Sequence, residues 1–278
     1  MNRYYITTPL YYVNSKPHIG HSYTQVVCDA AARFHRQVKG SEVYFMTGTD
    51  EHGEKIEDAA VKAGFKPGEE KRFVATIVPL FKQAWQDLGI EYDHFIRTTD
   101  FVHEETVKKV LSALHAKGDI QKRVYKGFFC TPCEAFWSES QVPDGLCPDC
   151  KRPVERLDEE NYFFVISKYQ KALLEHIKNN PGFIYPDIRR NEVVSFLEKN
   201  ELQDLCISRP RNRMNWGIEI PFDKDFVTYV WFDALINYIA GAGYLDDRKS
   251  FDMTWPEATH YNGKDILRHH ANYWPNML

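Results

Sequence analysis

The chain has 278 residues, of which 43% are hydrophobic and 27% charged, so it can bury a core and is neither disordered nor of low complexity. Its 35 basic and 39 acidic side chains give a net charge of −4, which excludes nucleic-acid binding through bulk charge and leaves that role to a local basic patch. The sequence has no apolar run of transmembrane length and no basic, apolar leader, so we expect neither a membrane span nor a signal peptide.

Strands and helices are predicted to alternate over the first part of the chain. Runs of β-branched and aromatic residues predict strands, and apolar residues at helical spacing, ended by glycine, predict helices. The strands are expected at 3–8, 42–46 and 92–97, the helices at 18–39, at 69–88, at 102–117 and between 54 and 64, and the loops at 9–17 and 48–53. Such alternation predicts an α/β fold with a Rossmann-like parallel sheet.

The alternation stops near Gly118. Turn residues and cysteine pairs fill residues 125–156, after which the sequence predicts a strand at 160–166, a helix at 169–177, an apolar stretch at 227–232 with a helix to about 240, and a last helix at 266–278. We therefore expect three parts: the first half of a nucleotide-binding domain (1–116), a connective insertion (117–225, with the cysteine knuckles at about 125–157) and an incomplete second half (226–278). Because the pattern stops on apolar residues, we expect the chain to be a fragment.

Two histidines, His18 and His21, stand at the start of the first predicted helix with Gly20 between them. Residues three apart lie on one helical face, and the free N–H groups and dipole of a helix N-terminus favour an anion. Gly20 lets a ligand approach the backbone, so this segment suits a nucleotide phosphate beyond the carboxyl end of a strand. The alternative is two surface histidines near a helix cap.

Four of the six cysteines form two C-x-x-C pairs, Cys130 with Cys133 and Cys147 with Cys150. Thirteen residues between the pairs allow four thiolates to meet around one tetrahedral ion, which favours structural Zn²⁺ with no open coordination position. Paired cysteines without an export signal also predict a reducing cytoplasm, with Cys28 and Cys206 as buried thiols. Four unrelated free thiols are the alternative.

Two further segments carry candidate binding residues. Trp231, Leu235 and Tyr238 fall at i, i+4 and i+7 of a predicted helix, which is the spacing of a pocket wall and equally of an ordinary buried face. Gly263 and Asp265 follow a predicted strand and precede a helix, where a carboxylate can bind ribose hydroxyls or simply cap the helix.

The order of these motifs resembles class I aminoacyl-tRNA synthetases, and within them the methionyl-tRNA synthetase family. The matching segments are 8–14, 18–21, 48–53, 207–210, 216–218, 227–238 and 263–267. The block at 231–238 is the most specific of these, since sister enzymes share the histidine motif. Residues 261–262 depart from the small apolar pair that is usual in the family.

The resemblance implies the site residues. His18 and His21 would have a catalytic role on the phosphates of ATP. The residues implied to bind ATP are His18, Gly20, His21, Gly263 and Asp265. The residues implied to form a methionine pocket are Leu10, Tyr12, Asp50, Trp231, Ala234, Leu235, Tyr238, Ile266 and His270. Asp50 would hold the α-ammonium group. An apolar, aromatic pocket suits the polarizable methionine sulfur.

The implied function is that of a methionine–tRNA ligase with ATP, accompanied by Mg²⁺, methionine and tRNA(Met) as substrates. Basic residues of the insertion would meet the tRNA acceptor end or form an ordinary solvated surface: Lys122, Arg123, Lys126, Lys151, Arg152 and Arg156. The family's second signature loop lies beyond Leu278, so the isolated chain is expected to adenylate methionine poorly or not at all. Three alternatives remain: half of a split enzyme completed by a second polypeptide, a non-catalytic RNA-binding module, and another class I ligase, against which Trp231 argues.

Overall fold

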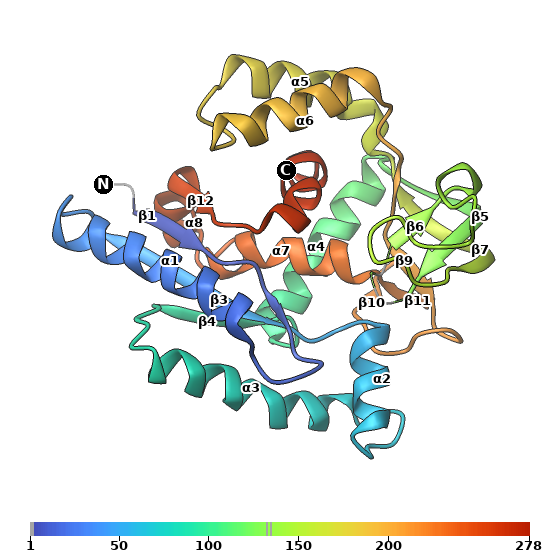
Figure 1. Cartoon of the computed structure of the whole chain (residues 1–278), viewed down its shortest axis with the longest axis horizontal. Coiled ribbons are helices and arrows are strands. Elements are labelled where there is room, and N and C mark those ends of the chain that lie inside the picture. Colours follow the sequence, from blue (N-terminus) through green and yellow to red (C-terminus); the bar gives the residue numbers. More distant parts are fainter. Residues whose placement is uncertain (1–2, 132, 134) are drawn as a thin grey trace.

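A parallel sheet forms the centre of the molecule in the computed structural model, which describes residues 3–131, 133 and 135–278. Its strands are β1 (Tyr4–Thr7), β2 (Tyr11–Tyr12), β3 (Val43–Asp50), β4 (His94–Arg97) and β12 (Ala258–His260). They lie in the order β12-β1-β3-β2, with β4 also paired to β3, and every pairing is parallel. The predicted α/β fold with a parallel sheet is confirmed (Figure 1).

Helices cover both faces of this sheet. Successive strand residues point to opposite faces, so both faces carry apolar side chains that the helices bury. Ile6 and Phe45 contribute to a core with α1 (Ile19–Gln37) and α3 (Glu70–Asp87), whereas Tyr5 and Met46 contribute to a second core. The second core includes α4 (Phe101–Ala116) and α7 (Val230–Gly241). The site described below therefore rests on a sheet that is buried on both faces.

The first helix is confirmed, but its apolar face does not lie in the core. Tyr23 and Phe34 are 73% and 47% exposed, whereas the side chains that α1 buries are Gln25, Cys28, Asp29 and Ala32. Gln25 accepts hydrogen bonds from the hydroxyls of Tyr11 and Thr47, so the buried face of this helix is partly polar.

Two predicted loops are shorter than expected. β3 extends to Asp50, so the turn predicted at 48–53 is reduced to the residues before α2 (Glu54–Lys62). The loop predicted at 9–17 contains β2, whose Tyr12 pairs with Asp50. Both segments are held in extended conformation by hydrogen bonds to neighbouring strands of the sheet. Local turn propensity gives no information on such pairing.

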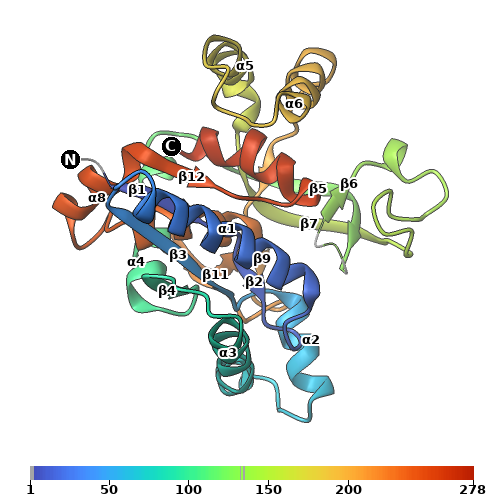
Figure 2. The same ribbon diagram turned by 60° about the vertical axis from the view of Figure 1, so that its left-hand side comes forward.

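The insertion contains a long antiparallel hairpin where the sequence predicted turns. β5 (Ile120–Cys130) pairs with β7 (Glu155–Phe164) along its length, and β6 (Ala135–Trp137) and β8 (Leu205–Cys206) flank them. Two antiparallel helices follow β7, α5 (Gln170–Asn179) and α6 (Asp187–Lys199). The hairpin and this helix pair project from the sheet in different directions (Figure 2). α6 was not predicted, because it buries only Val193 and Leu197 and so shows little apolar periodicity.

The chain returns to the parallel sheet through a small antiparallel sheet. Its strands are β9 (Ser208–Pro210), β10 (Glu219–Ile220) and β11 (Asp223–Thr228), in the order β10-β11-β9. The proposed boundary at 116/117 falls at the end of α4, and that at 225/226 falls within β11. Both boundaries stay predictions.

Helical segments complete the second half. α8 (Arg248–Thr254) precedes β12, and residues 264–277 form one continuous series of helical turns whose geometry changes from 3₁₀ to π and back to 3₁₀. The predicted last helix is therefore present without being a regular α-helix. Among the described residues, no helix has the length and apolar content of a membrane span.

Candidate functional site

The carboxyl ends of the parallel strands meet at one edge of the sheet, and several of the predicted site residues lie there. Asp50 ends β3, Tyr12 ends β2 beside it, and Gly263 and Asp265 follow the end of β12. The first helix begins at the same edge, because the chain reaches His18 directly after β2. This edge is where open α/β sheets bind ligands.

His18 and His21 form the N-terminal cap of α1. The Nδ1 atom of His18 accepts a hydrogen bond of 3.1 Å from the N–H of Gly20, and Nδ1 of His21 accepts one of 3.4 Å from the N–H of His18. The two rings stack with centroids 3.7 Å apart. A side chain at position 20 would crowd the His18 ring, since its Cβ would lie 3.0 Å from Cε1. Gly20 therefore leaves room for the His18 ring in this cap.

The cap also determines which ring nitrogens carry protons. Because both Nδ1 atoms accept hydrogen bonds, the network assigns the proton of each neutral ring to Nε2. Burial, followed by the neighbouring His18, lowers the pKa of His21 to about 4. His21 is therefore neutral near pH 7. It can offer a neutral N–H to an anion at the helix N-terminus.

β2 and the residue before it contribute two predicted pocket residues, Tyr12 and Leu10. Leu10 packs against the core of α4 and α7, and Tyr12 packs against the core of α1 and α3. The backbone carbonyl of Asp50 accepts a hydrogen bond from Val13, which holds the two strand ends together. Asp50 itself is 4% exposed. A carboxylate at this depth can bind a cation strongly, because little water competes with it.

The predicted face of α7 points towards the last helical segment. The Tyr238 hydroxyl lies 2.7 Å from Nε2 of His270, whose Nδ1 lies 3.0 Å from the Ile266 carbonyl. Leu235 and Ala234 are buried, whereas Trp231 is half-buried. These contacts bring together Tyr238, Ile266 and His270 from segments more than 25 residues apart, and their assignment to a methionine pocket stays a prediction.

Two histidines that the sequence analysis did not single out belong to this cluster. The His269 ring stacks on Trp231 at 3.7 Å, and the His260 ring lies 4.1 Å from that of Tyr238. His260 also lies 2.7 Å from the Thr7 hydroxyl and accepts a hydrogen bond from the Trp274 indole. The sequence signal that could have pointed to these two histidines is the high aromatic content of residues 255–274.

Asp265 lies in the first turn after Gly263 and is exposed. Because position 263 is a glycine, the Asp265 carboxylate can lie close against the backbone there, in space that a Cβ atom would occupy. The segment begins directly after β12, as predicted. An exposed carboxylate here can accept hydrogen bonds from ribose hydroxyls.

We expect acid to destabilise the chain through His260, His269 and His270. Burial lowers the pKa of these groups to about 3, 3 and 4, so unfolding takes up protons below about pH 6.5. The free energy of unfolding should therefore fall by about 2 kcal/mol or more between pH 7 and pH 5. Urea titrations at both pH values measure this. A smaller fall is expected for His270→Gln, and equal stability at both pH values would contradict the assignment.

The four paired cysteines meet as predicted. Sγ of Cys130 lies 3.5 Å from that of Cys150, Sγ of Cys133 lies 3.9 Å from that of Cys147, and all four sulfurs lie within 4.8 Å of one another. A tetrahedral zinc–thiolate site separates its sulfurs by ~3.8 Å. The cluster can hold a metal ion and leaves no protein ligand position open. Cys28 and Cys206 are buried elsewhere, as expected.

Several basic side chains of the insertion form ion pairs with acidic neighbours. Lys122 contacts Glu160 and Asp223, and Arg123 contacts Asp204 at 2.7 Å. These two side chains are therefore less available for phosphates than the sequence suggests. Lys126 lies 3.9 Å from Asp158, but both of these side chains are largely exposed.

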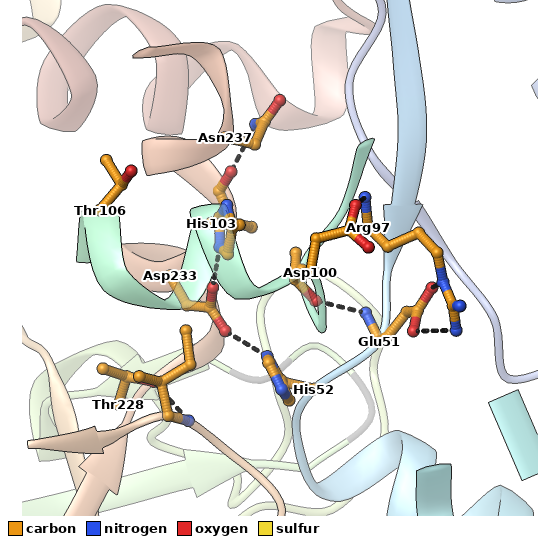
Figure 3. Close-up of polar contacts among 12 residues, drawn as sticks. Glu51, His52, Arg97, Asp100, His103, Thr106, Thr228, Asp233 and Asn237 are labelled. Atoms are coloured by element: carbon orange, nitrogen blue, oxygen red, sulfur yellow. Dashed lines mark hydrogen bonds and ion pairs between the residues drawn. The ribbon is translucent and has the colours of Figure 1, made fainter. Parts of the chain in front are cut away.

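A buried polar network next to Asp50 was missed by the sequence analysis (Figure 3). The Asp233 carboxylate on α7 accepts hydrogen bonds of 2.6 Å from Nδ1 of His52 and from Nε2 of His103. Burial alone would raise the pKa of Asp233, but His52 and His103 lower it to about 2. Burial would likewise lower the pKa of His52, and the Asp233 carboxylate reverses this and raises it.

A second set of contacts holds the residue between Asp50 and His52. Arg97 binds both carboxylate oxygens of Glu51, at 2.7 and 2.8 Å (Figure 3). The hydroxyls of Thr49 and Thr99 donate to the same carboxylate at 2.7 and 2.6 Å. Because these partners are separated by up to 48 residues, no local sequence signal pointed to them.

A cavity of about 470 Å³ lies away from this edge, between α4, α5 and the last residues of the chain. Leu114, Tyr169, Leu173, Phe183 and Met277 are among its lining residues. Its walls are mainly apolar, and none of the predicted site residues reaches it.

Known proteins match this chain over its whole length. The family model for class I tRNA synthetases (M) matches residues 4–159 and 152–278. The methionine–tRNA ligases of Caldanaerobacter subterraneus subsp. tengcongensis and Clostridium tetani are 51% and 50% identical over 276 residues, which cover 99% of this chain and 42% of each relative. The chain therefore spans less than half the length of these curated relatives.

Solved structures agree with the sequence relatives. The Mycobacterium tuberculosis methionyl-tRNA synthetase in complex with methionyl-adenylate superposes with a TM-score of 0.93 at 43% identity, over 100% of this chain and 54% of that chain. The free-state structure of the same enzyme superposes with a TM-score of 0.82 at 41% identity, over 100% and 53%.

Proposed function

Because this chain belongs to the family of class I tRNA synthetases (M), we propose that it is the part of a methionine–tRNA ligase that activates methionine with ATP. The observation that carries the proposal is the meeting of two kinds of group at one sheet edge. Imidazole donors stand at a helix N-terminus, and the buried carboxylate of Asp50 lies two residues before His52, which contacts the aromatic helix α7. The first kind suits phosphate, and the second suits an amino acid with a long apolar side chain.

In the proposed reaction, a carboxylate oxygen of methionine attacks the α-phosphorus of ATP. The bond from that phosphorus to the oxygen bridging to the β-phosphate breaks, and pyrophosphate leaves with the electron pair. ATP enters as its Mg²⁺ complex. His18 and His21 donate Nε2–H groups to phosphate oxygens, where charge develops in the transition state. Gly20 keeps the helix N-terminus open to the same oxygens.

Asp50 binds the α-ammonium group, and this leaves the methionine carboxylate directed towards ATP. The thioether side chain packs among Leu10, Tyr12 and the face formed by Trp231, Ala234, Leu235 and Tyr238, with Ile266 and His270 closing the pocket. Sulfur packs favourably against aromatic rings. Gly263 and Asp265 receive the adenosine ribose. The protein contributes position and charge stabilisation, and the covalent change occurs between the substrates.

We further propose that the activated methionyl group passes to tRNA(Met) and that the cysteine cluster binds structural zinc. Four thiolates at tetrahedral spacing favour Zn²⁺. The ion would hold the tip of the β5–β7 hairpin, where Lys151, Arg152 and Arg156 carry the positive charge that an acceptor end requires. We place this chemistry in the cytoplasm, where thiols stay reduced.

Methionine binding tests the proposed function without requiring pyrophosphate exchange. We expect calorimetric titration of the 278-residue chain with methionine to give a saturable isotherm, and leucine, valine and cysteine to bind at least tenfold more weakly. Asp50→Asn is expected to abolish the methionine signal, because the ammonium group loses its counter-charge. Equal binding of leucine and methionine, or no binding of either, would contradict the proposal.

Pyrophosphate exchange then tests catalysis. Methionine-dependent exchange that appears only after a separate polypeptide is added would support a split enzyme. Zinc-dependent RNA binding by a chain that does not bind methionine would favour an RNA-binding module instead.

A further inference from the structure

We propose that Asp233 is a positioning residue, which with His52 and His103 holds the segment after β3 against α7 and thereby sets the position of Asp50 relative to the Trp231–Tyr238 face. The inference rests on the proposed function, in which Asp50 binds the ammonium group and α7 binds the side chain. It assigns a role to a buried network that touches no substrate in the proposed mechanism.

The network joins three elements that are far apart in sequence. His52 follows the end of β3, His103 lies in α4, and Asp233 lies in the first turn of α7. Each carboxylate oxygen of Asp233 accepts one hydrogen bond of 2.6 Å, so a single side chain fixes both partners. His52 is two residues from Asp50, and Asp233 is two residues from Trp231. The network therefore connects the segment that follows Asp50 directly to the helix that carries Trp231.

All three side chains are withdrawn from solvent. His52 is 4% exposed, and Asp233 and His103 are completely buried. Hydrogen bonds to a charged group in such surroundings are short and directional, and breaking one leaves a buried group without its partner. Apolar side chains of similar volume would often stabilise a core as well as a buried ion pair does. The network therefore differs from apolar packing less in stability than in geometry, because its hydrogen bonds hold His52 and His103 at defined positions relative to Asp233.

The position of Asp50 is defined from two sides. Glu51 is held towards β4 by Arg97, and the next residue, His52, is held towards α7 by Asp233. The indole N–H of Trp216 also donates to the Glu51 carbonyl. Because β4 holds the Glu51 side chain and α7 holds the His52 side chain, the backbone directly after Asp50 has little freedom to shift.

Asp233 does not itself compete for the substrate ammonium group. Its carboxylate faces His52, and that contact raises the pKa of His52. Its oxygens are also both engaged. In the proposed function Asp50 is the carboxylate that binds the ammonium group, and the network influences where that carboxylate lies.

The test compares methionine with 4-(methylthio)butanoate, which has the same side chain and carboxylate but no ammonium group. For Asp233→Asn we expect the dissociation constant of methionine, measured by calorimetry, to rise about tenfold. The dissociation constant of the analogue should change less than twofold, because only the ammonium contact depends on the position of Asp50. A merely structural role would weaken both ligands equally, and that result would overturn the inference.

A matched control separates positioning from stability. Asp119 is also completely buried and contacts Lys168 and the Tyr169 hydroxyl, but it lies in the insertion. Asp119→Asn should lower the thermal midpoint without changing methionine affinity. If it weakened methionine as much as Asp233→Asn does, the inference would be wrong.

Variants at His103 keep the test decisive if Asp233→Asn does not fold. His103→Gln retains an N–H donor near the position of Nε2 and should bind methionine within about threefold of the unchanged chain. His103→Leu removes the donor and should bind about tenfold more weakly. Equal affinity of these two variants would overturn the inference. A failure of the unchanged chain to bind methionine would instead refute the proposed function.

Discussion

Replacing His21 by alanine is expected to lower methionine-dependent ATP–pyrophosphate exchange about 100-fold in a protein that contains this chain and is active. The loss of one preorganised donor to developing charge costs about 3 kcal/mol in activation free energy. His21 is held for this purpose by the cap of α1, and burial keeps it neutral near pH 7. The methionine dissociation constant should change little, because His21 is assigned to ATP phosphates.

His21→Gln provides the matched comparison, because its amide N–H can take the place of Nε2–H and should restore part of the rate. His176→Ala, an exposed histidine of α5 far from the sheet edge, should leave exchange unchanged. Thermal midpoints of all variants show whether loss of the cap contributes, since removal of a helix cap costs about 1 kcal/mol. A fall of less than threefold in His21→Ala would refute the role assigned to this residue.

Metal removal is the second change with a large expected effect. Structural zinc sites contribute on the order of 10 kcal/mol of binding free energy, and that energy stabilises the fold around the ion. Chelation, or Cys133→Ser, should therefore unfold the tip of the β5–β7 hairpin and expose residues 131–154 to protease. The parallel sheet should remain folded, because its two cores contain none of the four cysteines of the cluster.

Zinc content, measured by atomic absorption, should be one ion per chain and should fall below about a tenth of that in Cys133→Ser. Cys206→Ser is the control, since Cys206 is a buried thiol outside the cluster. It should retain its zinc even if it loses stability. Full zinc content in Cys133→Ser, or protection of the hairpin after chelation, would contradict the proposed site.

Local patterns were sufficient for a large part of this molecule. The alternation of strands and helices predicted the parallel sheet, and the C-x-x-C spacing predicted the cysteine cluster, because each depends on residues close together in sequence. The cap at His18 and His21 is also local, since its partners are two or three residues apart. Pairing between residues far apart in sequence was less visible. β3 is therefore longer than predicted, and β5 was not predicted at all.

Sequence patterns alone were enough to predict the fold class, the meeting of the four paired cysteines and the position of His18 and His21 at the start of α1. Three features became visible only in the folded chain. α1 exposes its apolar face, His269 and His260 contact Trp231 and Tyr238, and His52 and His103 converge on Asp233 across 181 and 130 residues. The physical reason is that a period or a spacing describes one element, whereas the burial and partners of a side chain depend on which other elements pack against it.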